Sequence, residues 1–480
     1  MAKHIAHSIA SEAVEPHASE WDQVYNPATG EVLGDVPLDD FGAVDQAVKT
    51  AAEAFAEWSG TSILERARCM FRYRDLLERH HQELAEMVTR EHGKILSDAY
   101  NEVGRGIEVV ELAAGAPSIL KGEILPGVAT GVEVFMLRVP LGVVTGITPF
   151  NFPAMIPLWM IPPAIVSGNT FILKPSERTP LTSLRLLELL TEAGVPKGVV
   201  NVVHGGRLVV DRLLSHPVVR AVSFVGSEPV AKHVYQTAAA YGKRVQALGG
   251  AKNFHVVMPD ANRGRTIDAL TSSAFGSAGE RCLAGAVVIA VGEAGDWLTE
   301  AMAQRAESLA VGEGTAASVE MGPLIRAAHR DRVVRYIERG QREGARLVYD
   351  GRRHPVPAQG FFLGPSLFDD VHPEMSIAQE EIFGPVLSVM RQPNLPAAVE
   401  VANRSRFGNT ATIYTQSGAA AQYFRDHIEA GMVGVNIGVA APVAWFPFAG
   451  WKDSFYGDLH ATGTDAFLFY TERRVTTTRW

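Results

Sequence analysis

The hydrophobic pattern divides the chain into a helical stretch followed by a region where strands and helices alternate. Apolar residues recur every three to four positions across 41–59 and 64–101 and continue toward Gly115, which predicts amphipathic helices. After residue 140, short apolar runs alternate with helical segments. Strands are expected at Val143–Ile147, Phe171–Leu173, Val199–Val203, Ala221–Val225, Arg244–Leu248 and Phe254–Met258. This order predicts an open parallel sheet covered by helices, and a second alternating block spans about 262–436.

Residues 139–173 form a run of 35 positions without a formal charge. Six prolines and three glycines interrupt the run, whereas a membrane-spanning helix needs about 20 uninterrupted apolar residues. The expected structure is a buried strand, an irregular loop, a short helix and a second buried strand. Outside this core, 122–138 reads as strands, and so do Ala466–Tyr470 and Arg474–Thr478. A terminal strand needs a neighbour, so pairing across subunits is expected.

Composition excludes several classes of protein. A net charge of −9 argues against a general nucleic-acid binder, which would carry a basic surface. The N-terminal segment has no apolar core typical of a signal peptide, and no membrane span is expected. The two cysteines, Cys69 and Cys282, are too far apart in sequence to suggest a metal-ligand cluster or a disulfide framework, and they suit a reducing cytoplasm. We therefore expect a cytoplasmic globular protein without a metal site.

Two segments are candidate nucleotide contacts. In Phe171–Glu177 a buried strand delivers Lys174, Ser176 and Glu177 to its carboxyl end, where ligands bind in open α/β sheets. A carboxylate there can accept both hydroxyls of an adenosine ribose and would repel a 2′-phosphate, which favours NAD over NADP. Gly226 and Ser227 end another strand before a helix whose N-terminus could bind a pyrophosphate. The alternatives are a solvated loop with ordinary charges and plain helix capping.

Two further residues are candidates for chemistry. Cys282 lies in Gly279–Leu283 beside Arg281, and a guanidinium or backbone N–H groups would increase the thiolate fraction of a nucleophilic cysteine. Asn151 lies between two prolines, and its amide could stabilise an oxyanion, a donor worth about 2.7–4 kcal/mol. The alternatives are a buried core cysteine and a turn asparagine. Cys69, on an apparent helix, fits the core interpretation better.

Together these segments resemble the aldehyde dehydrogenase superfamily over nearly the whole chain and in the family's order. The similar segments are Pro149–Pro153, Leu173–Glu177, Phe224–Ser227, Leu248–Gly250, Gly279–Cys282, Glu380–Pro385 and Phe407–Asn409. The resemblance implies an α/β fold with three parts. These are a Rossmann-type NAD domain (1–121 and 141–251), a catalytic domain (252–455) and a small β oligomerisation arm (122–140 and 456–480). A homodimer or homotetramer is implied.

The resemblance also implies roles for the candidate residues. Cys282 is the nucleophile and Asn151 the oxyanion donor. Lys174 and Glu177 hold the adenosine ribose, Glu381 holds the nicotinamide ribose, and Phe383 packs near the nicotinamide. Phe150, Ser176, Gly226 and Ser227 complete the implied NAD contacts.

One departure from the family pattern concerns the second half of the reaction. Hydrolytic members place a glutamate before Leu-Gly-Gly as the general base, and this chain has Ala247 there. A thioester on Cys282 would then hydrolyse slowly, because general base catalysis contributes about 10²–10⁴-fold. A thiol acceptor needs less activation. The chain accordingly resembles CoA-acylating methylmalonate-semialdehyde (malonate-semialdehyde) dehydrogenases, with similar segments at Asn101–Glu108, Ala114–Ser118, Gly250–Asn253, Val257–Asn262 and Phe469–Thr471.

In that subfamily two arginines bind the substrate carboxylate, and their positions match Arg105 and Arg281. A planar guanidinium suits a carboxylate. The alternative for Arg105 is a salt bridge on the helix surface with Glu102 or Glu108. Two positions differ from the subfamily: the loop 436–448 has lost most of its prolines, and Glu280 replaces a glutamine, where an acid could pair with Arg281. Another acidic aldehyde is therefore an open alternative substrate.

The resemblance implies an NAD-dependent aldehyde dehydrogenase that uses CoA as co-substrate. The expected substrate is a small aldehyde with a carboxylate, such as methylmalonate or malonate semialdehyde, and the product is propionyl-CoA or acetyl-CoA. The alternatives are hydrolysis to a free acid, with a base other than position 247, and a catalytically silent protein on the same fold.

Overall fold

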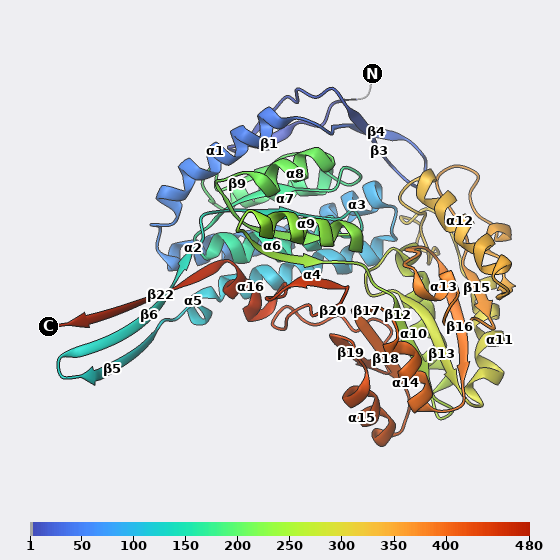
Figure 1. Ribbon diagram of the computed structural model, residues 1–480. Helices are drawn as coiled ribbons and strands as arrows, with labels where there is room; N and C mark the ends of the chain where they lie inside the picture. Colours follow the sequence, from blue (N-terminus) through green and yellow to red (C-terminus); the bar gives the residue numbers. More distant parts are fainter. Residues whose placement is uncertain (1–2) are drawn as a thin grey trace.

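The computed structural model describes residues 3–480 and contains two large sheets and a projecting arm (Figure 1). The first sheet has eight strands in the order β2-β1-β9-β8-β7-β10-β11-β21. Its strands are β1 (His7–Ile9), β2 (Glu12–Val14), β7 (Val143–Ile147), β8 (Thr170–Lys174), β9 (Val200–Val202), β10 (Val219–Val225), β11 (Arg244–Leu248) and β21 (Phe455–Gly457). The five central strands are mutually parallel, which confirms the predicted parallel sheet.

Helices cover both faces of this sheet (Figure 1). They are α1 (Phe41–Trp58), α2 (Ile63–Arg79), α3 (His81–His92), α4 (Leu96–Ala114), α5 (Ala116–Ile119), α6 (Met155–Val166), α7 (Leu181–Glu192), α8 (Arg207–Ser215) and α9 (Glu228–Ala240). The predicted helical stretch is confirmed, with breaks at His80 and at residues 93–95. Every residue of α6 is buried. The uncharged run is therefore a buried strand, a loop, a helix and a second buried strand, as expected.

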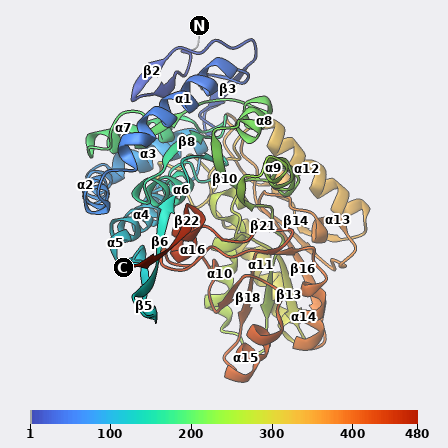
Figure 2. The same cartoon turned by 60° about the vertical axis from the view of Figure 1, so that its left-hand side comes forward.

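The second sheet has seven strands in the order β14-β15-β16-β13-β12-β18-β19. Its strands are β12 (Asn253–Val257), β13 (Gly285–Val291), β14 (Arg346–Tyr349), β15 (Ser366–Asp369), β16 (Val386–Gln392), β18 (Thr410–Tyr414) and β19 (Met432–Val435). The accompanying helices are α10 (Arg263–Phe275), α11 (Ala294–Glu307), α12 (Ala327–Arg342), α13 (Ser376–Gln379), α14 (Leu395–Asn403) and α15 (Gly418–His427). We call the first sheet with its helices the first body and the second sheet with its helices the second body. Figure 2 shows the two bodies side by side. Two small pairings complete the fold: β3 (Trp21–Tyr25) with β4 (Val32–Pro37), and β17 (Phe407–Gly408) with β20 (Trp451–Lys452).

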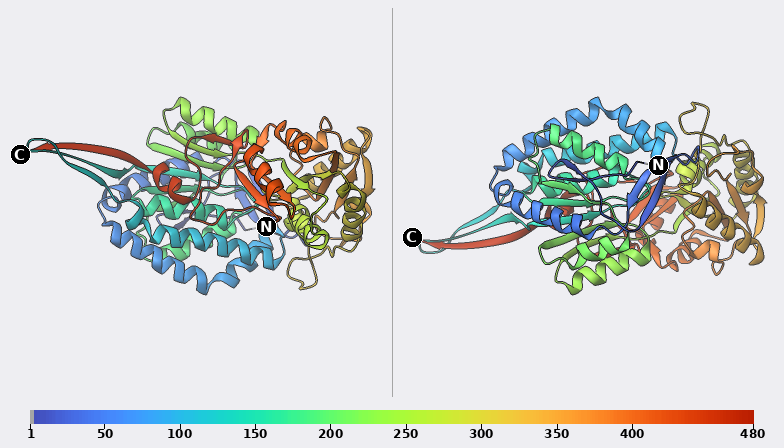
Figure 3. Two further views of the ribbon diagram at one scale, coloured as in Figure 1. Left: turned by 90° about the horizontal axis from the view of Figure 1, so that it is seen from below. Right: turned by 90° about the horizontal axis from the view of Figure 1, so that it is seen from above.

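The arm is a three-stranded antiparallel sheet that extends from the main body (Figures 1 and 3). It consists of β5 (Glu123–Ala129), β6 (Val132–Pro140) and β22 (Thr471–Arg479), so the predicted strands at 122–138 and 474–478 are confirmed. The predicted strand at Ala466–Tyr470 is wrong, because α16 (Gly463–Phe469) occupies it. Phe467 and Tyr470 are buried in the core around the first sheet, and a spacing of three places them on one face of a helix but on opposite faces of a strand.

Candidate active site

Cys282 follows a tight turn at the end of α10, and that turn requires an unusual backbone. Ser277, Ala278 and Gly279 have φ values of 49°, 52° and 73°, in the left-handed region that side chains other than glycine rarely adopt. A Cβ on Gly279 would lie 2.3 Å from the carbonyl oxygen of Gly384. Strained backbone of this kind is concentrated at functional sites. The turn packs against Gly384, in the segment before β16, and determines the position of Cys282.

Three asparagine side chains from distant parts of the chain hold the segment around Cys282. The amides of Asn253 and Asn409 donate to the carbonyl oxygen of Cys282 at 2.9 and 3.0 Å. The amide of Asn151 donates to the carbonyl oxygen of Glu280 at 2.9 Å. The structural roles of Asn253 and Asn409 were not predicted. The sequence feature that could have indicated these roles is a polar residue in an otherwise buried strand region. A buried amide there must find hydrogen-bond partners.

Cys282 opens onto a cavity of about 330 Å³ that lies between the two bodies. The cavity has an apolar side formed by Phe152, Met155, Trp159, Leu283, Val439 and Phe448. It also has charged residues, and both predicted substrate arginines, Arg105 and Arg281, are among them. An aldehyde near Cys282 could therefore place a carboxylate within reach of guanidinium groups.

Each of these arginines already pairs with a carboxylate. Arg105 contacts Glu108 at 2.9 and 3.1 Å, which is one of the surface pairings considered from the sequence. Arg281 donates to Asp98 at 2.5 Å and to the hydroxyl of Ser277 at 3.1 Å. A substrate carboxylate must therefore share or displace these partners. Asp98 could not be identified from the sequence as the partner, because it lies 183 positions before Arg281.

Glu280 does not pair with Arg281, a possibility that the sequence left open. The Glu280 side chain is fully buried on another side of the turn, where it accepts from the N–H of Ile325 and lies 3.5 Å from His329. Burial raises the pKa of Glu280 well above its ordinary value, although Ile325, Arg178 and Lys94 oppose this shift. The acid therefore does not compete with the substrate for Arg281.

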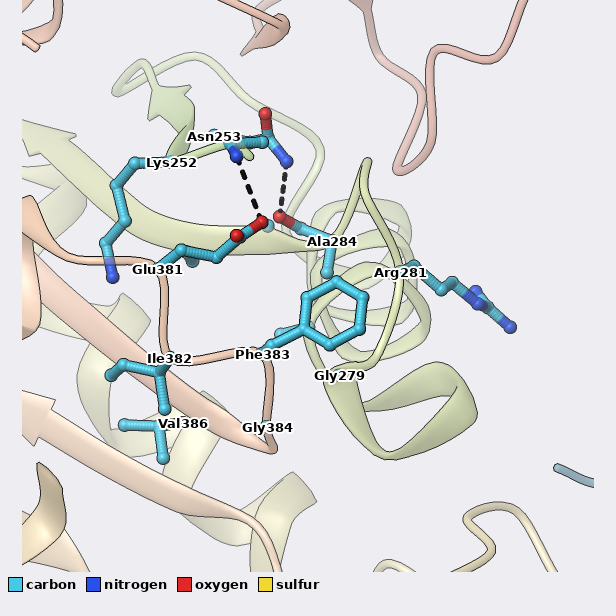
Figure 4. Close-up of a pocket in the computed structure, with 14 residues that line it drawn as sticks. Lys252, Asn253, Gly279, Arg281, Ala284, Glu381, Ile382, Phe383, Gly384 and Val386 are labelled. Atoms are coloured by element: carbon cyan, nitrogen blue, oxygen red, sulfur yellow. Dashed lines mark hydrogen bonds between the residues drawn. The ribbon is translucent and has the colours of Figure 1, made fainter. Parts of the chain in front are cut away.

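The Cys282 thiol is protonated in this state. Burial and the nearby Glu381 raise its pKa to about 12, and the N–H groups of Cys282 and Leu283 and the charge of Arg281 offset this only in part. Figure 4 shows Arg281 extending away from Glu381, and its guanidinium pairs with Asp98. The neighbouring guanidinium and the backbone N–H groups lower the pKa of Cys282, in the direction expected from the sequence, but burial and Glu381 outweigh them in the ligand-free protein.

The candidate nucleotide residues meet at one edge of the first sheet. Strands β8, β7 and β10 are neighbours, and their carboxyl ends lead to Lys174, to Asn151 and to Gly226. Lys174 lies 3.3 Å from Glu177. Burial would raise the pKa of Glu177, but Lys174, a backbone N–H and Arg178 outweigh it, so the net pKa is lowered and the carboxylate is charged. A charged carboxylate there can accept ribose hydroxyls. Ser176, in the same turn, accepts from the N–H of Arg178 at 3.2 Å.

The Ser227 hydroxyl makes no capping hydrogen bond at the N-terminus of α9. Helix capping therefore does not explain why a serine stands at this position. Glu228 is directed away from the helix start. It accepts from the hydroxyl of Tyr456 at 2.9 Å and pairs with Arg406 at 3.0 Å. The acid that could have repelled a pyrophosphate is thus engaged elsewhere.

Glu381 and Phe383 lie in the segment between α13 and β16, where Glu381 is close to Lys252 and Asn253 (Figure 4). Glu381 accepts from the N–H of Ala251 at 3.0 Å, and burial raises its pKa to about 7 although Lys252 opposes the shift. The Phe383 ring meets Phe150 edge to face with centroids 5.8 Å apart. Two aromatic rings and a carboxylate therefore lie where the two bodies meet.

A model of the aldehyde dehydrogenase family matches residues 14–476. Malonate-semialdehyde dehydrogenase 2 of Geobacillus kaustophilus is 54% identical over 98% of both chains, and malonate-semialdehyde dehydrogenase of Halalkalibacterium halodurans is 53% identical over 98% of this chain and 97% of its own.

Solved structures agree with these relatives. A methylmalonate-semialdehyde dehydrogenase from Oceanimonas doudoroffii is 49% identical, with a TM-score of 0.97 over 100% of this chain and 98% of its own. A Sinorhizobium meliloti protein complexed with NAD, provisionally given the same activity, is 44% identical, with a TM-score of 0.98 over the same shares. The fold, the site and these similarities lead to one conclusion: the chain belongs to the aldehyde dehydrogenase family.

Proposed function

We propose that this protein catalyses the NAD-dependent, CoA-acylating oxidation of a small carboxylated aldehyde. The observation that carries the proposal is the cavity in which Arg105, Arg281 and Cys282 lie together. The relatives named for malonate and methylmalonate semialdehyde support the choice of substrate. The products would be acetyl-CoA or propionyl-CoA and CO₂.

In the proposed reaction, Arg105 and Arg281 bind the substrate carboxylate and so orient the aldehyde carbon toward Cys282. Each charged hydrogen bond of this kind contributes about 1.5–3 kcal/mol. Cys282 loses its thiol proton to water, and the thiolate attacks that carbon. The Asn151 amide and the N–H of Cys282 stabilise the oxyanion. NAD, when bound, accepts the hydride. The acyl group is left as a thioester on Cys282. The substrate carboxylate is then released as CO₂, and the carbon that it leaves takes up a proton. The CoA thiol attacks the remaining thioester, gives acetyl-CoA or propionyl-CoA, and releases the Cys282 thiol.

The residues present fit NAD. The charged Glu177 beside Lys174 offers an acceptor and a donor for the adenosine ribose. Gly226 and Ser227, at the start of α9, would hold the pyrophosphate. Glu381 would hold the nicotinamide ribose, with Phe150 and Phe383 bordering the ring. Ser176 lies in the same turn as Glu177. We assign NAD binding to residues 1–121 and 141–251, and catalysis to 252–455.

Coenzyme A is the proposed acyl acceptor because position 247 cannot activate water. Ala247 is fully buried in an apolar cluster on β11 and carries no group that takes a proton. A thiol is the stronger nucleophile and needs less help. Hydrolysis is the second candidate, and one observation favours it: Glu381 has a pKa of about 7 and its charge acts on Cys282, so it could serve as a base.

The two candidates differ in their need for CoA. NADH formation is followed by absorbance with malonate semialdehyde, with and without CoA, and acyl-CoA is measured by mass spectrometry. We expect a single turnover per site without CoA, and continued turnover with acyl-CoA product when CoA is present. Full steady-state turnover without CoA, and no acyl-CoA product, would refute the acylating reaction.

We also propose that the protein is a cytoplasmic homodimer or homotetramer assembled through residues 122–140 and 456–480. Ile124, Leu125 and Val475 are 65%, 63% and 63% exposed on the arm, where a partner would cover them. No helix among residues 3–480 is long and apolar enough to cross a membrane. Light scattering after size exclusion tests the assembly: deletion of 471–480 should give monomers, and an unchanged mass would contradict this.

A further inference from the structure

Lys94 and Glu102 form a fully buried ion pair beneath the loop that carries Asn151. Their charged atoms are 2.6 Å apart, and both side chains have 0% exposure. Removing two charges from water costs several kcal/mol per ion, and such pairs are often no more stabilising than apolar residues of similar volume. Neither residue takes part in the reaction proposed above. Their retention inside the protein therefore points to a role other than stability.

The pair makes a set of bonds to one short segment. The ammonium of Lys94 donates to the carbonyl oxygen of Asn151 at 2.6 Å and lies 4.2 Å over the ring of Phe152. One oxygen of Glu102 accepts from Lys94, and the other accepts from the N–H groups of Ala154 and Met155 at 2.9 and 3.2 Å. A carboxylate at a helix N-terminus is favourable, and Met155 begins α6.

These contacts fix Asn151 at both ends. Its main-chain oxygen is held by Lys94, and its side-chain amide donates one N–H to the carbonyl oxygen of Glu280. A primary amide carries two N–H groups. Since the amide is planar and one N–H is committed, the direction of the second is determined. Among residues 3–480 the second N–H has no hydrogen-bond partner, and in the reaction proposed above it donates to the oxyanion.

We propose that Lys94 and Glu102 are positioning residues that hold the Asn151 amide in its oxyanion-stabilising orientation. They act through the loop and touch no reacting atom: Glu102 borders the cavity, but both its oxygens are occupied. A donor must be in place before charge develops, because reorientation during the reaction would cost the energy that the bond supplies. The inference rests on the proposed role of Asn151 and is independent of the acyl acceptor.

The test measures the NADH burst of the full-length enzyme by stopped flow, with saturating NAD and the best substrate from a panel of carboxylated aldehydes. The variants are Lys94→Met, Glu102→Gln and Asn151→Ala, together with Lys94→Met in the Asn151→Ala background. The matched control is Lys197→Met, which breaks the exposed pair of Lys197 with Glu12 (62% and 70% exposed, 3.0 Å). Loss of one oxyanion donor lowers the rate about 10²–10³-fold.

We expect Asn151→Ala to lower the burst rate about 100-fold, and Lys94→Met and Glu102→Gln to lower it at least tenfold. The aldehyde KM and the NAD Kd should change less than about threefold, and Lys197→Met should leave the rate unchanged. In the Asn151→Ala background, Lys94→Met should add no further loss, because effects through one donor are not additive.

Three outcomes would overturn the proposal: an unchanged burst in Asn151→Ala, an unchanged burst in Lys94→Met, or an equal further loss when Lys94→Met is added to Asn151→Ala. If Lys94→Met does not fold, Glu102→Gln alone decides. Glutamine keeps the shape of the glutamate side chain and one acceptor oxygen. An unchanged burst rate in Glu102→Gln would overturn the proposal. The burst precedes acyl transfer, so these variants would change the burst rate in the same way in a hydrolytic enzyme. Whether CoA is the acyl acceptor is decided separately, by the acyl-CoA assay.

Discussion

The high pKa of Cys282 predicts a slow, steeply pH-dependent reaction of the ligand-free enzyme with thiol reagents. With a pKa of about 12, about one thiol in ten thousand is ionised at pH 8, against about a quarter for an ordinary cysteine. The more basic thiolate is also the better nucleophile, with a Brønsted coefficient of about 0.4–0.5, which recovers about 1.5 orders of magnitude. The net expectation is a reaction about 50- to 100-fold slower than that of a free thiol.

The assay uses Cys69→Ala, which leaves Cys282 as the one thiol in the chain. A neutral aromatic disulfide such as dithiodipyridine is mixed with this variant between pH 6.5 and 10, and thione release is followed by absorbance. At every pH below its pKa the thiol is mostly protonated. The thiolate concentration, and with it the rate, should therefore increase about tenfold per pH unit without levelling off. Urea-unfolded protein provides the reference thiol, whose rate should level off above about pH 8.5.

A rate that levels off below pH 9 in the folded protein would refute this reasoning. Glu381→Gln separates the two causes of the raised pKa. Burial is the larger and Glu381 the second, so the variant should react faster at pH 8 while keeping the steep slope. If Glu381→Gln left the rate unchanged, the charge of Glu381 would not act on Cys282, and the case for this residue as an alternative base would be weakened.

Three further predictions concern single residues. Gly279→Ala should abolish the NADH burst and lower the melting temperature in scanning fluorimetry, because its Cβ would meet the carbonyl oxygen of Gly384. The control Gly242→Ala, also at positive φ but with open space around its Cβ, should keep full activity, and equal effects of the two substitutions would contradict the argument. Arg281→Gln should raise the KM for a carboxylated aldehyde about tenfold or more and leave that for propanal within threefold, and parallel changes would argue against carboxylate binding. Glu177→Gln should raise the KM for NAD about tenfold but not that for NADP, and an unchanged NAD-to-NADP ratio would exclude a ribose role.

The fold was predictable wherever local periodicity reflects burial. The parallel strands of the first sheet and the buried helix after Asn151 are confirmed, because apolar runs bounded by turns are sufficient to identify them. The strand predicted at Ala466–Tyr470 is a helix, because short apolar runs fit either structure and tertiary packing decides. The roles of the candidate residues remain predictions, although the structure places Lys174, Asn151 and Gly226 after adjacent strands.

The parts of the site that could not be predicted depend on long-range contacts. The partner of Arg281 is Asp98 rather than its neighbour Glu280, and no local pattern distinguishes these acids. The buried Lys94–Glu102 pair likewise looks in sequence like two ordinary charges on helical segments. Their importance follows from the loop that folds over them, which comes about fifty residues later in the chain.

The last strand of the first sheet has a consequence for synthesis on the ribosome. Strand β21, at residues 455–457, pairs with β11, and the whole second body lies between these two strands in the sequence. Until 455–457 leave the exit tunnel, β11 is an open edge that can pair with other chains. We therefore expect nascent chains that stop short of residue 455 to aggregate or to recruit chaperones, while the second body, complete by β19, can fold first. The first sheet would gain its last edge strand only after the second body has been synthesised.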